Sequence, residues 1–178
     1  MAKNRLNKEL EKQDKEELVR LLGEMARRFP IAKMYLTMEF GFESAGIIEK
    51  YKKEIEKEYF PSRGHGKARS SRVNKVLKEF TQIAAFKEDI LEMQWFQIEL
   101  AVKFYLTYGY DHDPFLNSLL KNWEKFIKGV LLENIISQYE ERIHQIIDGK
   151  SHRYWLFEQL KDIYENPEID EEELSDVH

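Results

Sequence analysis

The chain has 178 residues, of which 42% are hydrophobic, 13% aromatic and 34% charged, and its formal net charge is −5. This composition predicts one folded domain and excludes an intrinsically disordered chain. Because there is no cysteine, disulfides, zinc–thiolate sites and thiol catalysis are excluded as well.

Two further features concern location. Residues 1–13 are charged and lack the apolar core of a secretory signal. No stretch approaches the run of about 18 apolar residues that a membrane span requires. We therefore expect a soluble, cytoplasmic protein with no membrane partner.

The spacing of apolar residues predicts an all-α fold of six to seven helices, arranged as a bundle or as stacked helical pairs in the manner of a solenoid. The first predicted helix begins after Asp14, since the sequence Asp-Lys-Glu-Glu has the form of a capping box, and it ends before Pro30. A short helix follows over residues 31–41, and another over residues 43–57.

The apolar pattern in the second half of the chain predicts the remaining helices. Periodicity resumes at Val73, and residues 87–108 are apolar on more than one face, which is typical of the central helix of a domain. No strong breaker occurs in residues 114–147, although Gly129 could bend or split that helix. After a last helix over 151–164, we expect the single domain, residues 1–165, to give way to an acidic, flexible tail, residues 166–178.

The segment 59–72 interrupts the helices and is the strongest candidate for a functional site. Residues 62–78 contain six basic side chains and no acidic one. Glycines allow backbone N–H groups to converge, and the helix start that follows favours an anion. We therefore predict a site for phosphate, formed by Arg63, His65, Lys67, Arg69, Ser70, Ser71 and Arg72.

The same segment has other interpretations. The arginines could instead pair with a neighbouring glutamate-rich helix or with the acidic tail. Tyr59 and Phe60 could stack on nucleic-acid bases, but they flank a helix end, where core packing is commoner, and a pI near 5.7 argues against nucleic acid. Residues 64–68 lack the spacing of a Walker loop, and no strand precedes them, so a nucleotide hydrolase is not expected.

Two histidines were considered as metal ligands. Glu141 and His144 form one E-x-x-H unit, whereas a di-iron bundle needs two such units and two further glutamates. We expect His144 to be a capping or surface residue. The aspartates around His112 are explained by a turn before a helix. No metal site and no cofactor are predicted.

Several short motifs resemble those of one family. They are Glu58-Tyr59-Phe60-Pro61, then Lys67-Ala68-Arg69 before a helix with Lys75 and Phe80, and the later turn Tyr108-Gly109-Tyr110-Asp111. They are similar to a bacterial family of small helical proteins catalogued only as a domain of unknown function. The resemblance covers about residues 18–147. It implies a small helical bacterial cytosolic protein, and no activity or catalytic residue.

Three functions remain open. Because helices and aromatics are abundant and no catalytic constellation is present, we expect a non-enzymatic helical protein-interaction module, with a protein partner or a second copy of the chain. The alternative is a phosphate-ligand or nucleic-acid binder acting through residues 63–78. An enzyme that uses His65 or His144 beside a glutamate is the third interpretation.

Overall fold

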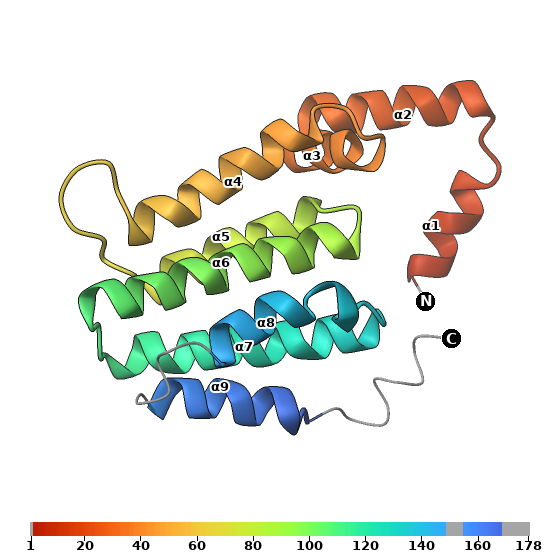
Figure 1. The fold of residues 1–178 in the computed structure, drawn as a ribbon. Helices are drawn as coiled ribbons and strands as arrows, with labels where there is room; N and C mark the ends of the chain where they lie inside the picture. The colour runs from red at the N-terminus through yellow and green to blue at the C-terminus, as the bar shows by residue number, and fades with distance from the viewer. Residues whose placement is uncertain (1, 149–154, 169–178) are drawn as a thin grey trace.

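The computed structural model describes residues 2–148 and 155–168, and within these ranges the fold is entirely helical, as predicted (Figure 1). The described helices are α1 (Ala2–Leu10), α2 (Lys15–Arg28), α3 (Pro30–Glu39), α4 (Ser44–Tyr59), α5 (Ser70–Ile83), α6 (Lys87–Tyr108), α7 (Asp113–Leu132), the 3-10 turn η1 (Ile136–Gln138), α8 (Glu140–Ile147) and α9 (Trp155–Glu165).

The described part of the chain has nine α-helices, so the predicted number of six to seven was too low. One extra helix is α1, whose sequence is charged and shows little apolar periodicity. The other arises because the predicted helix 114–147 divides into α7, η1 and α8. Helix α7 ends at Leu132, and Asn134 just beyond it adopts a φ of 54°. The helix therefore does not break at Gly129. Residues 151–154 and the tail from residue 169 lie outside the described residues.

The helices are stacked in layers. Helix α4 covers α5 and α6, α7 lies against α6, and α9 packs on α7 and α8 (Figure 1). Helices α1 and α2 leave this stack at one end, so the arrangement is neither a closed bundle nor a regular series of helical pairs. None of the described helices has an 18-residue stretch apolar enough to cross a membrane.

Helix α6 is the centre of the core, as its apolar faces predicted. Nine of its residues are buried, and Trp95 is fully enclosed, with its ring 6.1 Å from that of Trp123 and 5.2 Å from that of Phe126. Arg142 of α8 lies 4.9 Å from the Trp95 ring and forms an ion pair with Glu92 at 3.0 Å. Arg142 therefore holds α8 against α6 through an ion pair and a cation–π contact.

The N-terminal arm, which we define as α1, α2 and α3, is packed less closely. Asp14 caps α2 as predicted, since its carboxylate accepts a hydrogen bond from the Glu17 N–H at 2.8 Å. No residue of α2 is buried, and its main contacts are with α3, which in turn packs on α5 and α4. Within the arm, α3 is therefore the helix that contacts the rest of the fold, α4–α9, which we call the body.

Gly129 has a packing function inside α7. A Cβ atom at this position would lie 2.6 Å from Cδ2 of Leu91, so the glycine lets α7 approach α6 closely. Overpacking should cost about 1–3 kcal/mol, and the higher helix propensity of alanine offsets up to about 1 kcal/mol of it, so we expect Gly129→Ala to lower the free energy of unfolding by up to about 2 kcal/mol. Urea denaturation measures this change.

Gly23→Ala in α2 is the matched control, because no atom lies within 4 Å of the added methyl group. The higher helix propensity of alanine should raise stability by up to about 1 kcal/mol there. If Gly129→Ala proved as harmless as this control, the close approach of α6 and α7 would be contradicted.

Candidate functional site

The basic segment 59–72 is organised by one buried carboxylate, that of Glu58 in the last turn of α4. The Glu58 side chain is 7% exposed. It accepts hydrogen bonds from Nε of Arg69 at 3.0 Å and from Nη2 of Arg69 at 2.8 Å. Nε of Arg72 lies 3.2 Å from its Oε1 atom. Two guanidinium groups therefore neutralise one carboxylate.

The backbone of Glu58 holds the same segment. Its carbonyl oxygen accepts hydrogen bonds from the N–H groups of Lys67 and Ala68, both at 2.9 Å. Ala68 is buried and has φ 44°, which is uncommon for a residue with a side chain. These N–H groups point back to α4, so they do not converge on a bound anion.

Gly66 passes so close to α4 that no side chain fits. An added Cβ atom would collide with the carbonyl oxygen of Tyr59 and lie 2.9 Å from Cε2 of Phe104. The need for glycine here comes from this close packing, whereas Gly64 provides a positive φ of 76°. The glycines of the segment thus serve the fold of the loop itself.

The aromatic residues of the segment pack inward. The Tyr59 and Phe60 rings lie 5.8 and 5.9 Å from that of Phe104. Tyr59 is 2% exposed, and its hydroxyl accepts a hydrogen bond from Nε2 of Gln97 at 2.9 Å. Burial raises the pKa of Tyr59 to about 12. Its ring is part of the core and is not a surface for stacking bases.

The arginines and the lysine of the predicted site therefore fall into two groups. Arg69 and Arg72 are engaged with Glu58, which matches the alternative in which the arginines pair with a glutamate of a neighbouring helix. Arg63 and Lys67 are exposed and form no ion pair with a described residue.

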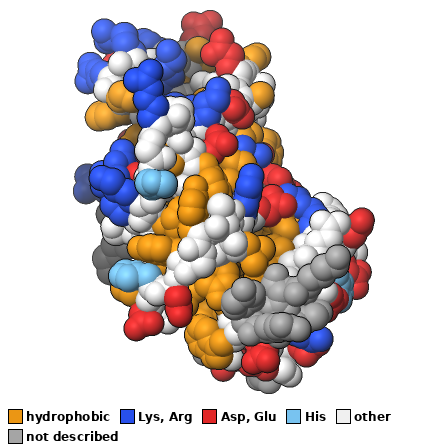
Figure 2. Space-filling model, turned by 60° about the vertical axis from the view of Figure 1, so that its left-hand side comes forward, with side chains coloured by type: hydrophobic (Ala, Val, Ile, Leu, Met, Phe, Trp, Pro, Cys, Tyr) orange, Lys and Arg blue, Asp and Glu red, His pale blue; other side chains and the backbone are white. Residues whose placement is uncertain are grey.

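The other three predicted site residues are two serines and a histidine. Ser70 begins α5 without providing a side-chain cap, Ser71 is exposed, and His65 packs its ring edge on Tyr108. Figure 2 shows basic side chains gathered on the face that carries this loop. Binding of an external anion here stays a prediction.

The charge of Glu58 is stabilised in the folded protein. Hydrogen bonds from Arg69, with the positive charges of Arg69 and Arg72, hold the pKa of the Glu58 carboxyl below its usual value, against the opposing effect of burial. A carboxyl whose pKa is lowered by folding stabilises the native state at neutral pH. That contribution is lost as the pH falls through the folded-state pKa.

We expect Glu58→Gln to lower the free energy of unfolding at pH 7 by about 1–3 kcal/mol, because hydrogen bonds to a charged group are lost. The difference from the wild type should shrink as the pH falls through the lowered pKa of Glu58, where the wild-type carboxyl also becomes protonated. Urea denaturation at several pH values measures both effects.

Glu56→Gln, in the same turn of α4, is the control, since the Glu56 side chain is exposed and forms no ion pair with a described residue. It should change stability by less than about 0.5 kcal/mol. Equal effects of the two substitutions would show that Glu58 does not organise the loop.

An apolar surface on the arm was not predicted as a site. Eight large hydrophobic side chains of α2, α3 and the turns beside α3 are 41–69% exposed. Their apolar spacing is visible in the sequence and predicts helices, but it does not show whether these side chains are covered in the folded chain. We call these residues the arm surface: Val19, Leu22, Met25, Phe29, Ile31, Tyr35, Phe40 and Phe42.

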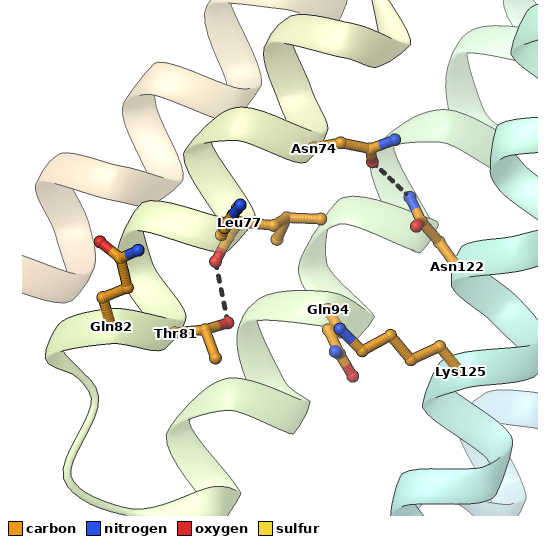
Figure 3. Close-up of a pocket in the computed structure, with 8 residues that line it drawn as sticks. Asn74, Leu77, Thr81, Gln82, Gln94, Asn122 and Lys125 are labelled. Atoms are coloured by element: carbon orange, nitrogen blue, oxygen red, sulfur yellow. Dashed lines mark hydrogen bonds between the residues drawn. The ribbon is translucent and has the colours of Figure 1, made fainter. Parts of the chain in front are cut away.

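A polar groove is the second feature that was not predicted. It has a volume of about 500 Å³ and lies between α5 and α7 above α6 (Figure 3). Its signal in the sequence is weak, because its side chains are scattered over three helices and form no motif. It is lined by Asn74, Leu77, Lys78, Thr81, Gln82, Gln94, Asn122 and Lys125.

The E-x-x-H unit lies on the solvent-exposed face of α8. Glu141 and His144 are both exposed, whereas Ile143 between them is buried. His144 lies at the end of α8, with Nδ1 2.6 Å from Oδ2 of Asp148, in the surface position predicted for it. Within the described residues, no three potential metal-ligating side chains of histidine or acid type come together.

Comparison with known proteins places the chain beside a family. The model of a family described as a family of unknown function (DUF6155) matches residues 1–168. No curated protein and no solved structure matches the chain. The match covers the arm and the body, and it confirms that the chain resembles a family without an assigned function.

Proposed function

The chain belongs to DUF6155, a family of unknown function, and we propose that it is a non-enzymatic helical protein-interaction module that self-associates through the arm surface. The observation that carries this proposal is the exposure of the eight large hydrophobic side chains on α2, α3 and their flanking turns.

The size of the arm surface supports a stable contact. A large side chain presents about 150–250 Å² in total, so the exposed fractions correspond to roughly 800 Å². This area is close to the roughly 800 Å² that each partner contributes to a standard protein interface.

The stability of α2 supports the same conclusion. This helix has 14 residues, none of them buried. Isolated helices shorter than about 12–15 residues are marginal in water, and in proteins they are stabilised mainly by the packing of an apolar face. Helix α3 covers one side of that face, whereas Val19, Leu22 and Phe29 stay exposed. A partner on these residues would complete the packing of α2.

The charges of the arm favour a second copy of the chain as partner. Arg20 forms ion pairs with Glu17 and Glu24, and Arg28 with Glu24. Residues 15–42 contain five basic and four acidic side chains, which is almost neutral. This sum gives no support to nucleic acid or an anionic membrane as the partner of this segment. A near-neutral apolar face can pack on its own copy about a two-fold axis without like-charge repulsion.

We expect the wild-type chain to sediment as a dimer, at twice its mass of 21.4 kDa, and the double variant Leu22→Glu/Phe29→Glu to sediment as a monomer. Both replaced side chains are exposed in the single chain, so the variant should fold. In a dimer, by contrast, they would bury four unpaired carboxylates. Analytical ultracentrifugation measures the mass, and circular dichroism checks that the helix content is retained.

Arg27→Glu, which places a carboxylate on the polar side of α2, is the control and should leave the dimer intact, since Arg27 forms no ion pair with a described residue. Two outcomes would contradict self-association through the arm: a wild-type chain that stays monomeric at every concentration, or a dimer that the double variant does not weaken. If the chain stayed monomeric and bound a different protein through the arm, it would still be an interaction module, but its partner would not be a second copy of the chain.

Arg63 and Lys67 support the alternative function, a phosphate-ligand or nucleic-acid binder acting through residues 63–78. Both are exposed and without an ion-pair partner among the described residues. The engagement of Arg69 and Arg72 with Glu58 weakens this alternative, because half of the proposed anion-binding guanidinium and ammonium groups already have a carboxylate. We therefore rank it below the interaction module.

The proposal also keeps three expectations about the setting of the module. We propose that residues 1–165 act as one helical domain. We propose a bacterial, cytoplasmic protein, because its motifs resemble a bacterial family and the chain has no cysteine for the disulfides of an oxidising compartment. These expectations support a module that works inside the cell with other proteins.

A further inference from the structure

We propose that the groove between α5 and α7 binds the phosphate monoester of a small hydroxylated molecule, of the sugar-phosphate or nucleotide class. The groove is formed by residues outside the arm surface, so this inference is independent of self-association.

The first observation is an unpaired polar atom at the floor of the groove. Gln94 of α6 is 6% exposed, and its Oε1 atom is buried without a hydrogen-bond donor. Buried polar atoms in native proteins almost always have a partner. Figure 3 shows the Gln94 carboxamide between α5 and α7, beside the Lys125 side chain. Oε1 itself is closed off from solvent, so a hydroxyl or amino group of a ligand would supply the missing donor once the carboxamide turns toward the groove.

The only other such atom in the described part of the chain is Nε1 of Trp95, and it has a different setting. Trp95 is fully buried, with the rings of Trp123, Phe126 and Tyr139 within 5.2–6.1 Å. It lines no groove that a ligand could enter. Of these two residues, only Gln94 lines the groove.

The second observation is the charge of the groove. Lys78 and Lys125 line it and form no ion pair with a described residue, and none of its lining residues is acidic. Neighbouring lysines of the same helices do have partners, since Lys75 pairs with Glu79 and Lys128 with Glu124. Two unpaired ammonium groups match a phosphate monoester, whose charge at pH 7 is about −1.5 to −2.

The third observation is that one end of the groove is preorganised. Nδ2 of Asn122 donates to Oδ1 of Asn74 at 3.1 Å and to Oε1 of Gln97 at 3.0 Å. Gln97 is in turn held by the buried hydroxyl of Tyr59, and Asn74 donates to Ser118 Oγ at 3.2 Å. These contacts fix the Asn122 carboxamide, whose Oδ1 accepts no hydrogen bond from a described residue. That oxygen is a second acceptor for a ligand hydroxyl.

The three observations define the ligand by its chemistry. The anionic group would lie between Lys78 and Lys125, and hydroxyl groups would donate to Gln94 and Asn122. Leu77 adds an apolar contact for a ring. The volume of about 500 Å³ falls within the range of about 300–1,000 Å³ that is usual for small-molecule sites.

The test is isothermal titration of the full chain at low salt with ribose 5-phosphate and AMP, and with ribose and adenosine as unphosphorylated controls. We expect saturable binding of the phosphorylated compounds only, weakened as salt is raised. Lys125→Ala should weaken binding at least tenfold. Lys121→Ala, one turn away on α7 and outside the groove lining, should leave it unchanged.

Gln94→Leu separates a binding role from a structural one. Because it replaces an unpaired buried amide by an apolar group of similar size, we expect the free protein to unfold at the same or a higher urea concentration. Binding of ribose 5-phosphate should nevertheless weaken at least tenfold. If stability rose while affinity stayed unchanged, Gln94 would be only a packing residue and the inference would be overturned.

Other outcomes also overturn it. Absence of saturable binding would do so, as would binding of ribose and adenosine as strong as that of their phosphates. If binding were lost in Arg63→Ala/Lys67→Ala and retained in Lys125→Ala, the anion would occupy the basic loop and not the groove. None of these outcomes bears on the dimer, which is measured separately.

Discussion

The position of α5 depends on the ion pairs that the buried carboxylate of Glu58 forms with two arginines. Glu58 joins the end of α4 to the start of α5 through Arg69 and Arg72, while its carbonyl oxygen holds the N–H groups of Lys67 and Ala68. The loop between the helices is therefore closed by one residue with both its side chain and its backbone. A charge in this position is costly to bury alone, and the two guanidinium groups offset that cost.

The neighbouring residue extends this constraint across the body. The Tyr59 hydroxyl binds Gln97 of α6, Gln97 binds Asn122 of α7, and Asn122 binds Asn74 of α5. Four helices are thus connected by amides and one phenol, next to the groove in which Gln94 lacks a partner. The end of α4 and the polar groove belong to one hydrogen-bonded system. The arm surface lies apart from it, on α2, which has no buried residue, on α3 and on the turns beside α3.

Sequence patterns predicted most of the fold because its helices carry regular apolar faces. The cap at Asp14 and the central position of α6 follow from local residue types, and both were confirmed. Helix α1 was missed because its sequence shows charge and little periodicity. Gly129 was named as a point where the predicted helix 114–147 could bend or split, because glycine disfavours helices. It lies inside α7 and packs against Leu91, a tertiary contact that has no local signal.

The site was predictable only in part, for the same reason. The run of basic residues is visible in the sequence, but their pairing with Glu58 depends on how the chain returns to α4. The groove depends on Asn74, Gln94 and Asn122, neutral side chains from three helices whose meeting no spacing rule predicts.

The most direct measurement of the central constraint is amide hydrogen exchange of the wild-type chain, read residue by residue by NMR. The Lys67 and Ala68 amides should exchange as slowly as those of α4 and α5, and the exposed Arg63 and His65 amides much faster. Equal, fast exchange at all four positions would contradict a loop closed by Glu58.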